Sequence, residues 1–421
     1  MNITEFCRIM GFDAAVEAVL SPVWQEMVTT CPPDDLPFLD DAFLTRQLPR
    51  TGNDPAVLPE LLAAADIARR SPALKLYAWI LHRGLIRGEM LPGLPKLPPP
   101  EKLLGDLAGM FALAVALAAL PLIEAKHRAL GIPSSFTEEL FTWLRGTCDI
   151  HRARTGGRPG LYLGQYYWMR SYLDGELFRI GRFEYLIHTV PSFVPAVFRS
   201  RLTGRLAVLS PDNWCFDADG RRAAEGFRAR LILSGGKISG TPITPDGRAL
   251  CGRLLTLSAD EFQPVVNPWE WVPSIHIPGG GGMTPEKVLD SLRRAKDFFR
   301  RYFHRDIRMF CCNSWILSPD WERELPGSNL AAFQRLGWMI PSGIPSPTTG
   351  LFFVFGRIAV DFGKVPQETS LQRALKRLHD QGRLISGGGI FILTDDLDDL
   401  SDGFYRDPER SVPLPPADAA R

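Results

Sequence analysis

Apolar positions in the first 150 residues recur at the three- and four-residue steps of amphipathic helices. Such helices are predicted over 58–70 and 74–86, with a proline between them. The stretch 91–100 contains five prolines, which predicts a stiff extended connector. Residues 107–123 carry no charge, but the run is shorter than a usual membrane span. A buried core helix is therefore the favoured interpretation of this segment, and a membrane segment is the less favoured one.

Beyond residue 150 the spacing changes to the two-residue alternation of β-strands, interrupted by amphipathic helices. In 177–190, Phe183 and Tyr185 fall on one face and Glu184 on the other. The segment 285–303 is the clearest helix, because its apolar positions keep the helical step and a proline stands at its start. Further strands are predicted over 228–235, 271–278, 307–317, 350–356 and 387–393, and further helices over 328–340 and 369–382.

This change of pattern predicts an α+β or α/β protein with a helical part followed by a mixed-sheet part. We expect a helical N-terminal domain over 1–150, separated from a second domain over 155–395 by a basic, glycine-rich stretch. The remaining residues, 396–421, are acidic and rich in proline, and they are expected to form a mobile tail.

Charge and cysteine content exclude several classes of protein. The 421 residues contain 48 Lys and Arg against 47 Asp and Glu, a formal charge of +1, which argues against a nucleic-acid binder. The N-terminus lacks a basic region leading into an apolar segment, so no signal peptide is expected. The seven cysteines are scattered without metal-ligand spacing. These features predict a cytoplasmic protein with no metal and no membrane partner.

The most informative stretch is Ile275 to Pro285, in which a predicted strand leads through four consecutive glycines into a predicted helix. Glycines let backbone N–H groups approach a ligand, and a helix N-terminus favours negative charge, so the stretch suits a phosphate or pyrophosphate. Basic residues also outnumber acidic ones over 285–308, which would attract an anionic cofactor. The alternative is a flexible loop followed by a solvated helix face. The spacing matches neither the dinucleotide nor the P-loop motif.

Several segments together resemble a bacterial family of acyltransferase-domain proteins, in which a helical N-terminal domain precedes a domain similar to the GNAT N-acyltransferase fold. The segments are FRIGRFEY, HIPGGGGMTPEKVLDSLRRAKDFF, CNSWILSP, SNLAAFQRL and VPQETSLQRAL. The resemblance covers about residues 155–395 well and the helical half loosely. It implies a GNAT-like mixed-sheet domain and the use of acyl-CoA as co-substrate, with an amine as acceptor.

In such a fold a splayed central strand exposes backbone to the pantetheine arm, and the turn after it holds the pyrophosphate. The resemblance places this turn at Gly279, Gly280, Gly281, Gly282, Met283 and Thr284. Pro278 stands where the family's turn has Gln or Arg, and the predicted helix 329–340 lacks the Tyr that GNAT enzymes often use to protonate the leaving thiolate.

Acyl transfer to an amine needs a base for the ammonium proton and donors for the carbonyl oxyanion. His276 is a candidate base because it alternates away from the apolar strand face and lies beside the glycines. Glu184 is a second candidate, acting through a water, and Ser314 is a candidate hydrogen-bond donor. Each also has a structural interpretation: a hydrogen-bonded strand histidine, an arginine partner and a structural hydroxyl. Cys311 and Cys312 are expected to be inert core thiols.

Two functions remain open from the sequence. The first is an acyl-CoA-dependent N-acyltransferase that acts on a small-molecule amine. The alternative is a non-catalytic ligand-binding or interaction protein that retains the GNAT-like fold.

Overall fold

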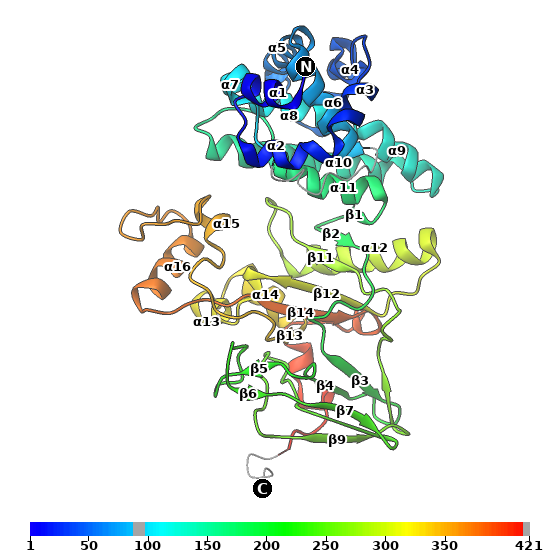
Figure 1. Cartoon of the computed structure of the whole chain (residues 1–421). Helices are drawn as coiled ribbons and strands as arrows, with labels where there is room; N and C mark the ends of the chain where they lie inside the picture. The colour runs from blue at the N-terminus through cyan, green and yellow to red at the C-terminus, as the bar shows by residue number, and fades with distance from the viewer. Residues whose placement is uncertain (87–96, 416–421) are drawn as a thin grey trace. The chain divides into compact units, whose positions relative to one another are not determined.

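The computed structural model describes residues 1–86 and 97–415 (Figure 1). The chain divides into two compact units, the first formed by Met1–Ile180 with Pro278–Gly280 and the second by Gly181–Ile277 with Gly281–Arg421. The helical part thus continues past residue 150 because one helix, α10, runs from Ser134 to Arg154 across the predicted boundary. The predicted limit of 150 is therefore too early.

The first unit is helical. Its helices are α1 (Ile3–Met10), α2 (Ala14–Leu20), α3 (Trp24–Thr30), α4 (Asp41–Gln47), α5 (Leu58–Arg70), α6 (Pro72–Ile86), α7 (Glu101–Leu104), α8 (Ala108–Leu117), α9 (Leu120–Ala129), α10 (Ser134–Arg154) and α11 (Tyr166–Asp174), followed by strand β1 (Leu177–Ile180). Of the predicted connector 91–100, residues 91–96 lie outside the described residues, and 97–100 have no regular structure.

Helix α8 forms the centre of this unit. All ten of its residues are buried, which agrees with the predicted core helix. The stretch Glu101–Ala129 is long and apolar enough to cross a membrane by length and composition, but 78% of its most apolar window is buried inside the protein. A helix that is apolar on every side and enclosed by other helices is typical of a protein core.

The second unit is built on a mixed sheet. Its strands are β2 (Phe183–Leu186), β3 (Ala196–Ser200), β4 (Leu206–Leu209), β5 (Cys215–Phe216), β6 (Phe227–Arg228), β7 (Leu231–Ser234), β8 (Lys237–Gly240), β9 (Leu255–Ser258), β10 (Phe262–Pro264), β11 (Ser274–His276), β12 (Met309–Ser314), β13 (Trp338–Ile340) and β14 (Gly388–Leu393). Its helices are α12 (Pro285–Phe303), α13 (Asp320–Glu324), α14 (Asn329–Arg335), α15 (Leu351–Phe355) and α16 (Ser370–Asp380).

The large sheet of this unit runs in the order β2-β11-β12-β14-β13. Only β11 and β12 are parallel, and α12 connects them, whereas the other neighbours are antiparallel. Between β2 and β11 the chain forms a separate set of small sheets, β10-β3-β4 and β7-β8-β9 with the pair β5-β6. The mixed sheet confirms the predicted fold class.

Helix α12 covers one face of the large sheet. Ser291 of the helix hydrogen-bonds the Tyr185 hydroxyl, with 2.9 Å between the oxygens, and accepts the Phe183 N–H at 3.3 Å. The ring of Phe299 lies 6.4 Å from that of Tyr185. Because side chains alternate along a strand, Glu184 lies on the opposite face of the sheet from these contacts.

Three predicted elements differ from the structure. The segment 350–356 forms helix α15 and not a strand, because two glycines with positive φ, Gly350 and Gly356, enclose one helical turn. The predicted helix 328–340 ends at Arg335, after which Trp338–Ile340 form strand β13. The predicted strand 177–190 is interrupted after Ile180 by Gly181, whose φ is 62°.

The expected mobile tail over 396–421 is wrong for residues 396–415. The Tyr405 hydroxyl donates to Asp396 at 2.9 Å and accepts the Leu393 N–H at 3.0 Å. Phe404 and Tyr405 are buried, and Val412 belongs to an apolar cluster with Phe198 and other residues of the small sheets. Acidic composition did not predict this packing, because the few apolar residues of the tail are the ones that anchor it.

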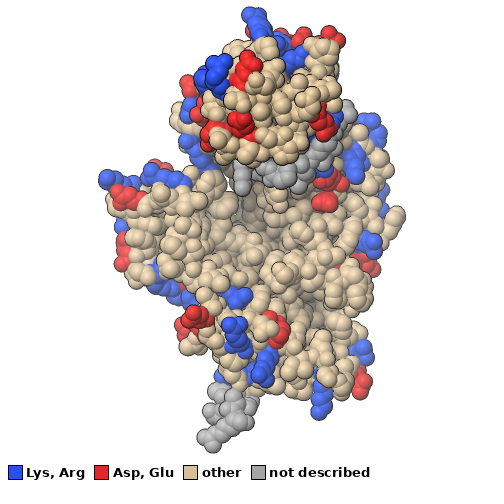
Figure 2. Space-filling model, viewed as in Figure 1, with Lys and Arg blue, Asp and Glu red and all other residues tan. Residues whose placement is uncertain are grey.

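Charged side chains of both signs occur on the surface. Figure 2 shows basic and acidic side chains close to one another on the face in view, as the near-zero net charge of the chain leads one to expect. The net charge of the chain therefore does not indicate the charge near any one site.

Candidate active site

The parallel strands β11 and β12 meet at one point and then part. One register pair joins them, Ser274 with Cys311, and the Cys311 N–H donates to the carbonyl of Pro273 at 3.2 Å. Beyond that pair, β11 continues to His276 along β2, and β12 continues to Ser314 along β14. Within the described residues no further register pair joins the two strands. The facing edges of the two strands therefore diverge beyond this pair.

The glycine stretch follows β11 directly and leads into α12, as predicted. Gly280 and Gly281 have φ values of 78° and 52°, which residues with side chains rarely adopt. Gly281 to Thr284 belong to the second unit with His276, whereas Gly279 and Gly280 group with the first. The side chain of Met283 is buried, so it can offer a ligand only its backbone.

Position 282 lies close to the start of α14. A Cβ atom there would lie 3.2 Å from the side-chain nitrogen of Asn329, the first residue of α14. The Gly282 carbonyl accepts a hydrogen bond from the Arg182 guanidinium at 3.2 Å. The sequence analysis did not select Arg182 or Asn329, and only the spatial neighbourhood of Gly282 reveals them.

The N-terminus of α12 already interacts with an anionic group. Thr284 is the N-cap by backbone geometry, but its side chain makes no capping hydrogen bond. The carboxylate of Glu286 instead accepts hydrogen bonds from its own backbone N–H and from the Thr284 side chain, which lower its pKa. An incoming phosphate at this helix end would share its donors with Glu286.

Most of the basic residues of α12 are engaged within the unit. Arg293 donates to the Leu397 carbonyl at 2.9 Å, Lys296 to that of Thr394 at 3.0 Å, and Arg300 pairs with Asp297 at 2.6 Å. Lys287 is exposed in the first turn and has no ion pair in the part of the chain that the structure describes. It is therefore the cation of this helix that is best placed for an anion at the glycine turn.

The structure brings Glu184 and His276 together. They are direct partners in the antiparallel register of β2 and β11, although 92 positions separate them in the chain. Residues paired in this way point to the same face, with Cβ atoms about 5 Å apart. Glu184 is only 5% exposed. The candidate base and the candidate carboxylate thus share one face of the sheet, opposite α12.

The environment of His276 differs from the sequence expectation of an ordinary imidazole. Burial, with a smaller contribution from the charge of His188, lowers its pKa to about 4. The ring is therefore neutral at neutral pH and can accept a proton. Its basicity is lower than that of a solvent-exposed imidazole, since a lowered pKa means that the protonated form is less stable.

Ser314 has a structural contact in this structure. It is the N-cap of the turn after β12, and its oxygen accepts the Ile316 N–H at 3.4 Å. Its neighbour Asn313 is the exposed residue, and the Asn313 side-chain oxygen accepts the Ser342 hydroxyl at 3.0 Å. An exposed amide at the point where β12 leaves β11 is a polar candidate that the sequence analysis missed. A polar residue directly after four buried residues of one strand was the available signal.

Cys311 and Cys312 lie in the centre of the sheet. Both are buried, and burial raises the pKa of Cys311 to about 12 and that of Cys312 still further. Thiols in this state are un-ionised at neutral pH and are poor nucleophiles. This agrees with the prediction of inert core thiols.

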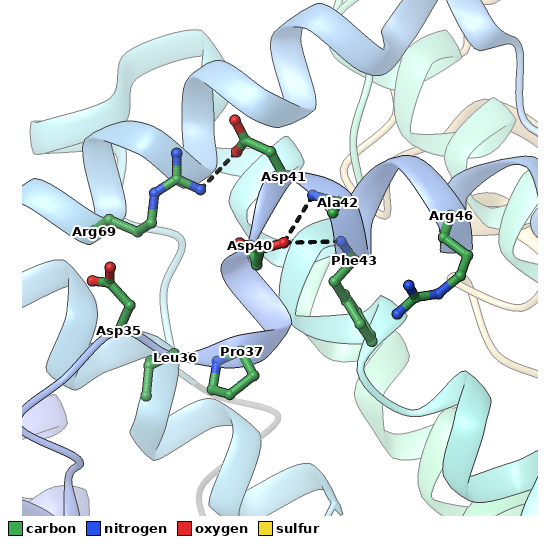
Figure 3. Close-up of a pocket in the computed structure, with 9 residues that line it drawn as sticks. All are labelled: Asp35, Leu36, Pro37, Asp40, Asp41, Ala42, Phe43, Arg46 and Arg69. Carbon is green, nitrogen blue, oxygen red and sulfur yellow. Dashed lines mark hydrogen bonds and ion pairs between the residues drawn. The ribbon is translucent and has the colours of Figure 1, made fainter.

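A cavity of about 500 Å³ lies in the helical unit near the start of α4 (Figure 3). Its polar groups serve the local fold. Asp40 caps α4 by accepting the N–H groups of Ala42 and Phe43, and Arg69 pairs with Asp41 at 2.7 Å. No chemistry is assigned to these residues.

Two protein families match this chain. Residues 177–391 match the family described as GNAT-like C-terminal domain, and residues 42–175 match the family described as N-acyltransferase N-terminal domain. The first match alone spans about half of the chain. The chain belongs to this family of N-acyltransferases with a GNAT-like domain, and it is an enzyme of that class.

Solved structures of an acyltransferase share the fold. The structure of an acyltransferase in complex with decanoyl-CoA and teicoplanin matches with a TM-score of 0.64 at 23% identity, covering 93% of this chain and 99% of that one. The complex with decanoyl-CoA matches with a TM-score of 0.60 at 22% identity and the same coverage. A search of curated proteins gave no match.

Proposed function

We propose that this enzyme transfers an acyl group from acyl-CoA to an amine, with the donor held where β11 and β12 part. The observation that carries the proposal is the single register pair between these strands, followed directly by the glycine turn and α12. Backbone N–H and C=O groups on the parted edges are of the kind that the amide groups of the pantetheine arm can hydrogen-bond. The turn and Lys287 suit the diphosphate.

The similar acyltransferase was crystallised with decanoyl-CoA, which supports a medium-chain acyl group as a first donor to test. That protein was also crystallised with teicoplanin. For the present chain we propose an amine-bearing acceptor. A cytoplasmic location stays a prediction.

The transfer requires two proton movements. We propose that neutral His276 accepts the first proton from the acceptor ammonium, which frees the nitrogen lone pair to attack the thioester carbonyl carbon. The tetrahedral intermediate collapses as the C–S bond breaks, the nitrogen releases its second proton, and the CoA thiolate is protonated to the thiol. Glu184, on the same sheet face, would stabilise the imidazolium by its charge or accept the proton through a water.

Titration of the purified protein with CoA and decanoyl-CoA, followed by measurement of thiol release with a mixed pool of amines, tests this function. We expect binding of both, and thiol release only when an amine is present. Absence of binding for both CoA and decanoyl-CoA would overturn the proposal. Binding without amine-dependent thiol release would contradict the proposed transfer.

A further inference from the structure

A second cavity, of about 900 Å³, lies between the small sheets that separate β2 from β11 in the chain. Its walls come from β3, β7, β8 and β10 and from the loops before β3 and after β10, and no residue of the glycine turn lines it. The volume is that of a typical small-molecule site. We call it the insert cleft.

The lining of the insert cleft is largely apolar. Phe198, Ile238 and Phe262 line it and also belong to the buried apolar cluster of the small sheets. Leu233 pairs with Ile238 in the register of β7 and β8 and lines the same cleft, yet it is 65% exposed. An apolar side chain aimed into a concave apolar space and left in water is typical of a ligand site.

Two cations at the insert cleft lack acidic partners. Arg201 donates to the neutral side-chain oxygen of Gln263 at 3.2 Å and to the Asp260 carbonyl at 3.0 Å. Lys237 is the first residue of β8 and is exposed. Neither forms an ion pair within residues 1–86 and 97–415. The one acid of the lining, Asp212, is engaged by the Leu231 N–H and by Asn213.

We propose that the insert cleft binds a free medium-chain carboxylate, separately from the acyl-CoA site. The alkyl chain lies along Leu233 and Phe262, where it removes apolar surface from water. The carboxylate is stabilised by the unpaired charges of Arg201 and Lys237, which favour an anionic end over a neutral or cationic one. This inference does not depend on the proposed transfer reaction.

Calorimetric titration with decanoate, decanol and decyltrimethylammonium tests the proposal on the full chain, with and without saturating CoA. We expect decanoate to bind whether or not CoA is present, decanol to bind about fivefold more weakly, and the cationic amphiphile weaker still. Equal binding of all three probes would overturn the charge argument. Loss of decanoate binding on saturation with CoA would show that the ligand occupies the acyl-CoA site instead.

Two neighbouring residues of β7 provide matched variants. Leu233→Asp places a carboxylate in the cleft and is expected to weaken decanoate binding at least about tenfold, since it removes apolar contact and adds repulsion. Ile232→Asp makes the same change at a residue that is 47% exposed and does not line the cleft, so binding should be unchanged. Both sites are exposed, and equal melting temperatures would confirm folding. Equal decanoate affinity of the two variants would overturn the proposal.

Discussion

The helical unit and the sheet unit each contain a histidine whose pKa is lowered to about 4, but the two imidazoles have different surroundings. His127 is 1% exposed in α9, with its Nδ1 atom 2.8 Å from the Thr137 hydroxyl and its ring 5.5 Å from that of Phe178. His276 ends β11 opposite Glu184 and precedes the glycine turn. Burial lowers both pKa values, so the pKa alone does not set the proposed base His276 apart from a histidine of the helical core. The two differ in position, since His276 lies where β11 and β12 part.

The largest expected effect comes from His276→Gln. If His276 takes the ammonium proton, its loss should lower the turnover rate about a hundredfold to ten-thousandfold while leaving CoA affinity nearly unchanged. Steady-state kinetics and CoA titration measure the two quantities. His127→Gln is the matched control and should keep the rate per folded molecule. Similar rates for the two variants would remove His276 from the mechanism and leave Glu184 as the candidate.

A large effect is also expected from pH on stability through His127. Its pKa lies near 4 in the folded protein, below the ordinary value near 6.5, so between these pH values the unfolded imidazole binds a proton that the folded one does not. The free energy of unfolding should therefore fall as pH falls, by about 1.4 kcal/mol per pH unit in this window.

Urea unfolding of the wild type and of His127→Gln at pH 6.5 and 4.5 measures this contribution. The variant should be less stable than the wild type at pH 6.5 and should lose less stability on acidification. If the free energy of unfolding of His127→Gln depended on pH in the same way as that of the wild type, His127 would not be the source of the acid destabilisation.

A smaller effect is expected at the glycine turn. Gly281→Ala places a side chain on a backbone with φ of 52°, which costs about 1–2 kcal/mol unless the turn changes shape. A distorted turn should raise the KM for acyl-CoA about tenfold with a smaller change in kcat. Gly279→Ala is the control, because its φ is not positive and nothing lies within 4 Å of an added Cβ. Equal KM values would contradict a role of the turn shape in donor binding.

The smallest effects are expected in opposite directions at two neighbouring residues of α12. Lys287→Gln removes a cation near the proposed diphosphate site, and Glu286→Gln removes the anion that occupies donors there. Near a helix N-terminus each charge contributes about 0.3–1 kcal/mol, or about two- to fivefold in affinity. CoA should bind more weakly to the first variant and more tightly to the second. A change in the same direction for both would be inconsistent with an anion site at this helix end.

The sequence predicted α12 at Pro285–Phe303 because the signals for this helix lie within the segment itself, namely the proline at its start and the helical spacing of its apolar residues. It predicted α15 wrongly, since aromatic residues between two glycines are typical of a strand and the turn geometry here favours a helix. The partnership of Glu184 with His276 was beyond sequence reasoning. It depends on the register of two strands that the whole small-sheet segment separates, and no local pattern encodes that register.

The position of β14 has a consequence for biosynthesis. This strand lies between β12 and β13, and all six of its residues are buried, yet it is made from residues 388–393, which follow both of those strands in the chain. During translation β12 and β13 emerge without the strand that joins them, and the edges that face it stay unpaired until residues 388–393 have left the ribosome. The sheet unit should therefore depend on chaperones in the cell, and shortening the chain before residue 388 should yield aggregates, not a smaller enzyme.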